Sequence, residues 1–224
     1  MCYASDMNER LGTGFDFSIK HRNEVRIELV NMDLPKRATA PTCWFVNSMS
    51  DFFGEFVAAD QIRQMIEVML NTPRHIYIIL TKREERMANY LSMHYPSMAD
   101  VPNIVWGTSA GTQKVYDAAM LHLLRTPAAI RMMSLEPLLE DVGLELSKYE
   151  GQLHWLIVGG ESGKKRRDCG VKAIESAAAQ CGIYNVPVFV KQDSASLPGQ
   201  QGRIPDRTWD MKQFPKLKEH ALGL

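Results

Sequence analysis

The sequence predicts an α/β protein built as a partial parallel (β/α) barrel. Three observations support this fold class: short apolar runs recur along the chain, segments of helical period separate most of them, and polar residues follow each run. The 224 residues, 45% of them hydrophobic, suit one domain with a large buried core. We expect the barrel to occupy residues 1–193, and residues 194–224, rich in Gly, Pro and Gln, to form a tail packed on it.

Six apolar runs are expected to be the strands of the barrel. Most of them lack the polar–apolar alternation of half-exposed strands, and continuous apolar strands suit a parallel sheet that is covered on both faces. In chain order the expected strands are Cys43 to Val46, Ile76 to Leu80, Ile104 to Trp106, Ile130 to Ser134, His154 to Val158 and Val186 to Val190.

The segments between these runs are expected to be mostly helical. After the first run, Asp60 can cap a helix whose apolar residues recur at three- and four-residue spacing. Strands that alternate with helices predict parallel crossover units. The further helical patterns are Glu84 to Met93, Gln113 to Leu124 and Val171 to Cys181, whereas Leu138 to Tyr149 is expected to be irregular or only partly helical.

Bulk charge and cysteine usage narrow the classes of function. The formal net charge is zero, so the composition gives no support for a nucleic-acid or membrane-surface protein. The dense positive run Lys164 to Arg167 fits either a solvated loop or a phosphate or nucleic-acid contact. The four cysteines are scattered, and no apolar run reaches the length of a membrane span, so we expect a soluble cytoplasmic protein without a membrane partner.

Polar residues follow every expected strand, and in a parallel barrel these ends share one face, where ligands bind. Helix capping or turn chemistry explains any single one of them equally well. Capping does not require the charged residues Lys82, Glu136, Glu161 and Lys191, and burying an unpaired charge is costly. The sequence therefore predicts a functional face at the carboxyl ends of the strands.

The polar strand ends belong to longer motifs that occur in order along almost the whole chain. These motifs are Trp44–Asp51, Leu80–Met87, Trp106–Ser109, Ser134–Leu138, Ile157–Gly163, Val188–Gln192 and Gly202–Asp210. Together they resemble the phage gene-product thirty-seven/sixty-eight family, a domain of unknown function from phages and prophages. That family is similar to the radical S-adenosylmethionine enzymes, so the resemblance implies a barrel of the radical S-adenosylmethionine type.

The resemblance implies a [4Fe–4S] cluster and S-adenosylmethionine as cofactors. Members of the family begin with a strand and a Cys-x6-Cys-x2-Cys-Tyr-Ala segment, whose three thiolates hold the cluster. This chain begins Met1-Cys2-Tyr3-Ala4, so Cys2 aligns with the third cysteine and is the expected metal ligand. One thiolate does not hold the cluster stably. We therefore expect the chain by itself to lack the cluster and the first strand of the barrel.

Two explanations of this departure stay open. Met1 is either an internal codon of a longer gene or the start of a shortened protein that lost the cluster and keeps the barrel for binding. The in-frame codons upstream of Met1 distinguish the two, because the first explanation requires a Cys-x6-Cys segment there.

By analogy with related barrels, we expect two sets of contacts at the strand ends. The cofactor contacts are expected from Asn47, Ser48, Ser50, Asp51, Thr108, Ser109, Gly159, Gly160 and Glu161. The substrate contacts are expected from Lys82, Arg83, Glu136, Lys191 and Gln192. A nucleic-acid or nucleotide substrate agrees with a phage setting, but the neutral net charge does not favour it.

The leading hypothesis for function is a radical S-adenosylmethionine-like protein of phage or prophage origin, inactive in a form that lacks two of the three cluster cysteines. The alternative is a non-catalytic accessory protein, a degenerate barrel that binds a ligand or a partner. An ordinary hydrolase is disfavoured, because no nucleophile–base pair or metal-ligand motif occurs in the sequence.

Overall fold

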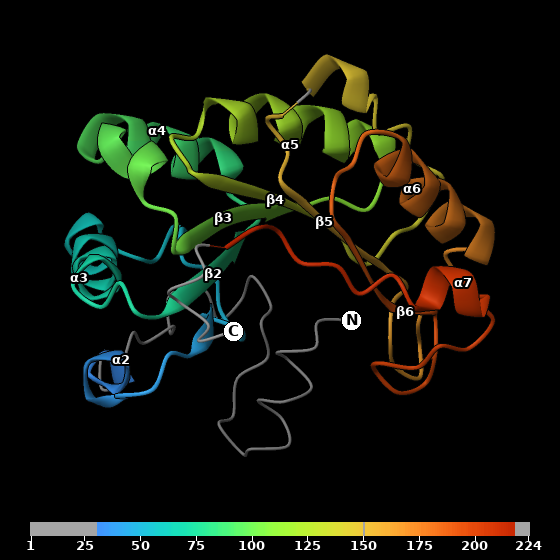
Figure 1. Cartoon of the computed structure of the whole chain (residues 1–224), viewed down its shortest axis with the longest axis horizontal. Helices are drawn as coiled ribbons and strands as arrows, with labels where there is room; N and C mark the ends of the chain where they lie inside the picture. Colours follow the sequence, from blue (N-terminus) through green and yellow to red (C-terminus); the bar gives the residue numbers. More distant parts are fainter. Residues whose placement is uncertain (1–30, 150, 218–224) are drawn as a thin grey trace.

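The computed structural model describes residues 31–149 and 151–217, in which six strands form one sheet. Every pairing is parallel, and the spatial order of the strands follows the sequence from β1 to β6. The sheet curls into a half-barrel (Figure 1). The strands are β1 (Cys43–Val46), β2 (Ile76–Thr81), β3 (Ile104–Ser109), β4 (Ile130–Leu135), β5 (Trp155–Gly159) and β6 (Val188–Gln192). The predicted α/β class and parallel sheet are thus confirmed.

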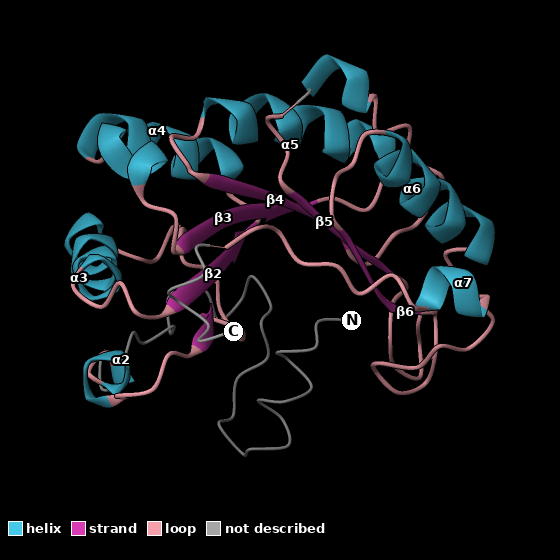
Figure 2. Cartoon of the chain, in the orientation of Figure 1, coloured by secondary structure: helices cyan, strands magenta, loops and turns pink. Residues whose placement is uncertain are grey.

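Four longer helices cover the convex face of the half-barrel, as Figure 2 shows. They are α3 (Ala59–Leu70), α4 (Glu84–His94), α5 (Gln113–Arg125) and α6 (Val171–Ile183). Each returns the chain to the amino end of the sheet, as parallel neighbours require. The short elements are α2 (Leu34–Arg37), η3 (Pro96–Asp100), η4 (Leu146–Tyr149) and α7 (Asp206–Trp209). None of the described helices is long and apolar enough to cross a membrane.

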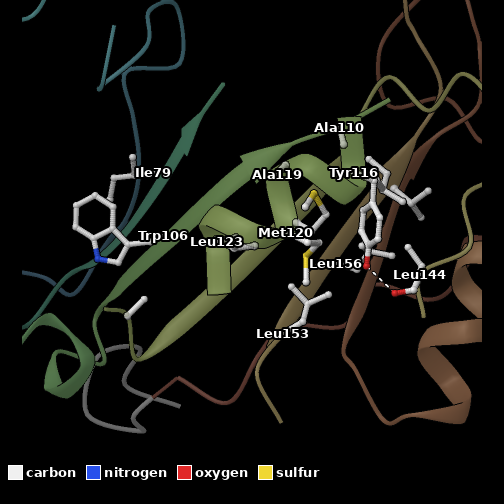
Figure 3. Close-up of a cluster of buried hydrophobic side chains, with 14 of the residues drawn as sticks. Ile79, Trp106, Ala110, Tyr116, Ala119, Met120, Leu123, Leu144, Leu153 and Leu156 are labelled. Carbon is white, nitrogen blue, oxygen red and sulfur yellow. Dashed lines mark hydrogen bonds between the residues drawn. The ribbon is translucent and has the colours of Figure 1, made fainter. Parts of the chain in front are cut away.

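The main core lies between the sheet and these helices. Trp106 of β3 and Leu156 of β5 are fully buried there together with Leu123 of α5 (Figure 3). Tyr116 of α5 is also fully buried, and its hydroxyl donates a hydrogen bond to the Leu144 carbonyl at 2.8 Å. Burial of each such side chain stabilises the fold by about 1.5–3 kcal/mol.

A second apolar cluster lies on the concave face of the sheet. Its buried members are Val105, Ile130, Met132 and Trp155. The C-terminal part of the described chain runs across this face (Figure 1). Lys212 forms an antiparallel bridge with Phe189 of β6, and the Trp155 indole donates to the Gln213 carbonyl at 3.0 Å. Burial on both faces explains why most strands read as continuous apolar runs.

Five of the six strands end later than the sequence pattern indicated, by two or three residues in β3 and β6 and by one in β2, β4 and β5. β3 ends at Ser109, because Thr108 and Ser109 continue the ladder opposite Met133 and Ser134 of β4. β6 ends at Gln192, two residues later than expected, but begins at Val188, two residues after the expected start at Val186. The polar residues expected after these strands are therefore their last residues, because backbone pairing continues past the apolar run.

Two histidines connect the amino ends of the strands. The Nδ1 atom of His75, just before β2, accepts the Thr42 backbone N–H at 3.1 Å. The Nδ1 atom of His154, just before β5, accepts the Arg131 backbone N–H at 3.0 Å. Both rings must be unprotonated at Nδ1 to accept these bonds.

Candidate functional site

The carboxyl ends of the six strands and their loops form one edge of the half-barrel, here called the carboxyl rim (residues 47–51, 81–83, 107–111, 134–137, 159–163 and 191–193). Parallel strands bring all of these segments to the same edge of the sheet. The predicted strand-end residues of the described chain therefore lie along one rim, and their individual contacts decide which of them a ligand can reach.

Hydrogen bonds accepted by Asp51 connect the loop after β1 to the end of β2. Its carboxylate accepts the Thr81 hydroxyl at 2.6 Å and the Lys82 backbone N–H at 3.0 Å, and Arg83 Nη1 lies 3.3 Å from it. The Asp51 side chain is 16% exposed. These contacts occupy both carboxylate oxygens. Asp51, expected to contact the cofactor, and Arg83, expected to contact the substrate, therefore hold the ends of β1 and β2 together.

The other predicted residues of the first two loops are more accessible. Ser48, Ser50 and Lys82 are exposed. Asn47 is partly buried and adopts a left-handed backbone conformation with a φ of 56°, which begins the turn closed by the Ser50 N–H to Asn47 carbonyl bond at 3.0 Å. This loop offers hydroxyl groups to a ligand beside the fixed Asp51 carboxylate.

The neighbouring residues Thr108 and Ser109 differ in their contacts. Thr108 is fully buried on the helix side, where its hydroxyl donates to the Thr81 carbonyl at 3.0 Å. Ser109 points to the concave side and is 7% exposed, and its Oγ has no hydrogen-bond partner within the described structure. An unsatisfied buried hydroxyl is costly, so Ser109 is the unusual member of the pair.

An ion pair joins β4 to β6 above the concave face. Lys191 Nζ lies 2.8 Å from Glu136 Oε1, with side chains that are 47% and 19% exposed, respectively. Lys191 points to the concave side, because it alternates with Phe189 of the concave cluster. Glu136 precedes Pro137 through a cis peptide bond. We call Ser109, Ser134, Glu136 and Lys191 the concave site.

Glu161 is held by Arg167 of the same loop. Arg167 donates from Nε at 2.9 Å and from Nη2 at 3.0 Å, and its backbone N–H adds a third bond at 2.8 Å. The hydrogen bonds from Arg167 lower the pKa of Glu161 to about 2. The orientation of the Glu161 carboxylate is therefore fixed. Of the basic run Lys164 to Arg167, Arg167 is paired with this carboxylate.

Gly159 and Gly160 end β5 where the next loop packs closely. A Cβ on Gly160 would lie 2.5 Å from the backbone N of Ser194, and one on Gly159 would lie 3.2 Å from the backbone of Gln192. These glycines are thus required by contacts within the protein. Gln192 is 2% exposed and donates to the Gly160 carbonyl at 2.8 Å, so this predicted substrate contact instead joins the two loops.

Sequence patterns did not single out the group formed by Asp168, Asp193 and Arg203. Arg203 binds Asp193 at 2.8 Å and Asp168 at 3.0 Å, and this pairing lowers the pKa of both carboxyl groups, that of Asp168 to about 2. Arg203 belongs to the motif Gly202–Asp210, which marked it as a residue of interest. Its carboxylate partners lie 10 and 35 residues away in the chain, so the sequence did not identify them.

An open cavity of about 630 Å³ lies beside this group, between the loops that follow β5 and β6. We call it the loop cavity. Its walls combine two arginines, two aspartates and several small polar residues, namely Arg166, Asp168, Asp193, Ser194, Ala195, Ser196, Gln200, Gly202 and Arg203.

The described residues do not fit a [4Fe–4S] cluster. Cys2, the expected ligand, lies outside them. Cys43 is exposed at the amino end of β1, whereas Cys169 and Cys181 are buried before and within α6. Partial desolvation raises the pKa of the Cys43 thiol, and burial raises those of Cys169 and Cys181, that of Cys181 to about 12, which opposes thiolate ligation.

One group of three metal-ligand side chains occurs in the described part of the chain, Asp168, Cys169 and Asp193. Its two carboxylates are already bound to Arg203, and it supplies one sulfur where a cluster requires three. It therefore does not replace the missing cysteine ligands.

Comparison with protein families identifies a match for the chain. A family model described as "Protein of unknown function (DUF5131)" matches residues 1–215. No curated protein and no solved structure matches the chain.

Proposed function

The chain belongs to the DUF5131 family of proteins of unknown function, and we propose that it is a radical S-adenosylmethionine-like protein of phage or prophage origin. In this proposal the half-barrel binds S-adenosylmethionine at its carboxyl rim, above the concave face. The sequence resemblance implies the cofactor, and the arrangement of the concave site supports a ligand of this chemistry.

The supporting observation is the position of the concave site above an apolar floor. Ser109 carries an unsatisfied hydroxyl, and the pair of Glu136 and Lys191 offers an anion and a cation side by side. The concave cluster around Met132 and Trp155 lies on the same face of the sheet and is buried within the protein, so it forms a rigid base for these polar groups. Ligand sites commonly depend on a few polar groups held in fixed positions.

S-Adenosylmethionine has complementary parts, an adenine ring and an amino acid that carries both charges. In the proposal Ser48, Ser50 and Ser109 donate or accept hydrogen bonds to the cofactor, whereas Glu161 is paired with Arg167 within the protein. Glu136 and Lys191 orient the substrate beside it. A bound [4Fe–4S] cluster together with this cofactor would supply radical chemistry, and the described residues do not supply its ligands.

A second candidate is a non-catalytic protein that binds a ligand or a partner through the same half-barrel. The observation in its favour is the placement of Cys43, Cys169 and Cys181, which are separate from one another and have raised pKa values. Anaerobic reconstitution with iron and sulfide distinguishes the candidates. A stoichiometric cluster with broad visible absorption excludes the non-catalytic candidate.

Calorimetric titration with S-adenosylmethionine tests the proposal without requiring the cluster. We expect saturable binding to the full chain, and binding about fivefold weaker to the variant Ser109→Ala, the effect of one neutral hydrogen bond of about 1 kcal/mol. Ser147→Ala is the matched control, because Ser147 is an exposed serine of η4, outside the carboxyl rim. Absence of binding, or equal losses in both variants, contradicts the proposal.

A further inference from the structure

The loop cavity lies between the loops that follow β5 and β6, the last two strands of the described sheet. Loops at the carboxyl ends of the strands commonly form the ligand sites of α/β barrels, phosphate sites among them. The cavity volume of about 630 Å³ falls within the range of small-molecule sites, about 300–1,000 Å³.

Arg166 provides a fixed positive charge at this cavity. Its Nε donates to the Ser194 carbonyl at 3.0 Å and its Nη1 to the Gly163 carbonyl at 3.3 Å. No carboxylate pairs with it in the part of the chain that the structure describes. Its neighbour Arg167, in contrast, is neutralised by Glu161. Arg166 is therefore held in position by backbone groups while its charge stays uncompensated.

The residues around Arg166 favour an anion. Lys164 and Lys165 precede it on the exposed loop, and neither forms an ion pair with a described residue. In the cavity wall Arg203 binds both Asp168 and Asp193, so the two arginines and two aspartates balance in charge, and the excess positive charge comes from Lys164 and Lys165. Hydroxyl groups of Ser194 and Ser196 complete the wall with the Gln200 amide.

We propose that the loop cavity binds a phosphate of a single-stranded nucleic acid. Arg166 contacts the phosphate in the cavity, and Lys164 and Lys165 contact the adjacent phosphates outside it. A strand is favoured over a single nucleotide, because three consecutive uncompensated cations exceed what one phosphate needs. This site is separate from the concave site, so the inference goes beyond cofactor binding and does not depend on it.

Fluorescence anisotropy with a labelled single-stranded oligonucleotide of about 12 nucleotides tests the inference. We expect the full chain to bind it with an affinity that falls as salt rises. The slope of log K against log salt should be about −2, because each contacted phosphate of a single strand contributes about −0.7. Arg166→Ala should weaken binding about tenfold or more. Two separate control variants, Lys36→Ala and Arg125→Ala, remove a positive charge at the amino ends of the strands and should bind the oligonucleotide as the wild type does.

A charge placed in the cavity wall gives a test that does not risk the fold. Ser196 is exposed, so Ser196→Asp and Ser196→Asn should both fold. The Asp variant should lose about tenfold or more in affinity by repelling the phosphate, whereas the Asn variant should bind normally.

Three results would overturn the inference: no binding by the wild type at low salt, equal affinities of the two Ser196 variants, or equally tight binding of a mononucleotide. Calorimetry with S-adenosylmethionine on the same variants separates the two sites. Loss of oligonucleotide binding by Ser196→Asp with unchanged cofactor binding supports two sites. If the wild type binds S-adenosylmethionine but not the oligonucleotide, the proposed phosphate site in the loop cavity is rejected and the proposed cofactor site is not.

Discussion

Arg203 surrounds the buried carboxylate of Asp193 with three hydrogen bonds. Its backbone N–H donates at 2.8 Å, its Nε at 2.9 Å and its Nη2 at 2.8 Å. The guanidinium continues to Asp168, which lies just before α6. The end of β6, the loop before α6 and the segment before α7 are therefore tied together by one side chain.

Replacement of Arg203 should destabilise the protein strongly. Arg203→Ala leaves Asp193, whose side chain is 2% exposed, as a buried charge without its cation. Breaking a fully buried pair costs about 3–5 kcal/mol, and the loss here should lie at the lower end of that range because the Arg203 side chain is 53% exposed. Urea unfolding measures the loss, with Arg207→Ala as the control, because Arg207 is 84% exposed and its pair with Glu175 should contribute under about 1 kcal/mol. Equal stability of the two variants would contradict the structural role of Arg203.

The pair of Glu161 and Arg167 predicts a loss of stability in acid. The pKa of Glu161 is about 2 in the folded chain because Arg167 binds it, and it is about 4.3 in an unfolded chain. The stabilisation is present above the unfolded pKa and disappears as pH falls toward 2. Thermal unfolding from pH 5 to 2 should show a shallower decline for Glu161→Gln than for the wild type. Parallel curves would show that the pair does not contribute.

His154 predicts a separate change near neutral pH. Burial, assisted by the charge of Arg131, lowers the pKa of His154 below its usual value of about 6.5. The folded state therefore favours the neutral ring, so stability is complete above pH 6.5 and declines as pH falls below it. The free energy of unfolding should drop between pH 7 and 5.5, and less so in His154→Gln. A steeper drop in the variant would exclude this explanation.

Thr108 and Ser109 provide a matched comparison of two adjacent hydroxyl groups. Thr108→Val removes the hydrogen bond to the Thr81 carbonyl and should destabilise the chain by about 1 kcal/mol. Ser109→Ala removes a buried hydroxyl without a partner and should stabilise the chain by about 1 kcal/mol, while weakening the binding of S-adenosylmethionine. Chemical denaturation of both variants measures the difference. Destabilisation by Ser109→Ala would mean that this hydroxyl is satisfied in the free protein.

The strands were predictable from the sequence because they are buried on both faces. The run of apolar residues in β4 and β5 reflects the helices on one side and the concave cluster around Trp155 on the other. The uncertain segment after β4 contains only the 3-10 turn η4, which agrees with its weak helical pattern. Local periodicity was therefore sufficient to predict the order of the main elements.

The roles of individual rim residues depend on partners that are distant in the chain. Thr108 and Gln192 look like ligand contacts in the sequence, but their polar atoms bind Thr81, Gly160 and Gly199 within the protein. Arg203 had no assigned role, because its carboxylate partners become neighbours only in the folded chain. Position at the end of a strand identifies candidates, and tertiary contacts decide which of them stay available to a ligand.

Hydrogen–deuterium exchange with and without S-adenosylmethionine tests the central claim most directly, because it locates the bound cofactor on the half-barrel. We predict slower exchange at the carboxyl rim, in residues 47–51, 107–111 and 159–163, and unchanged exchange at the amino ends of the strands near Thr42 and Arg131. Protection confined to the amino ends, or no change at the carboxyl rim at saturating cofactor, would contradict the proposed site.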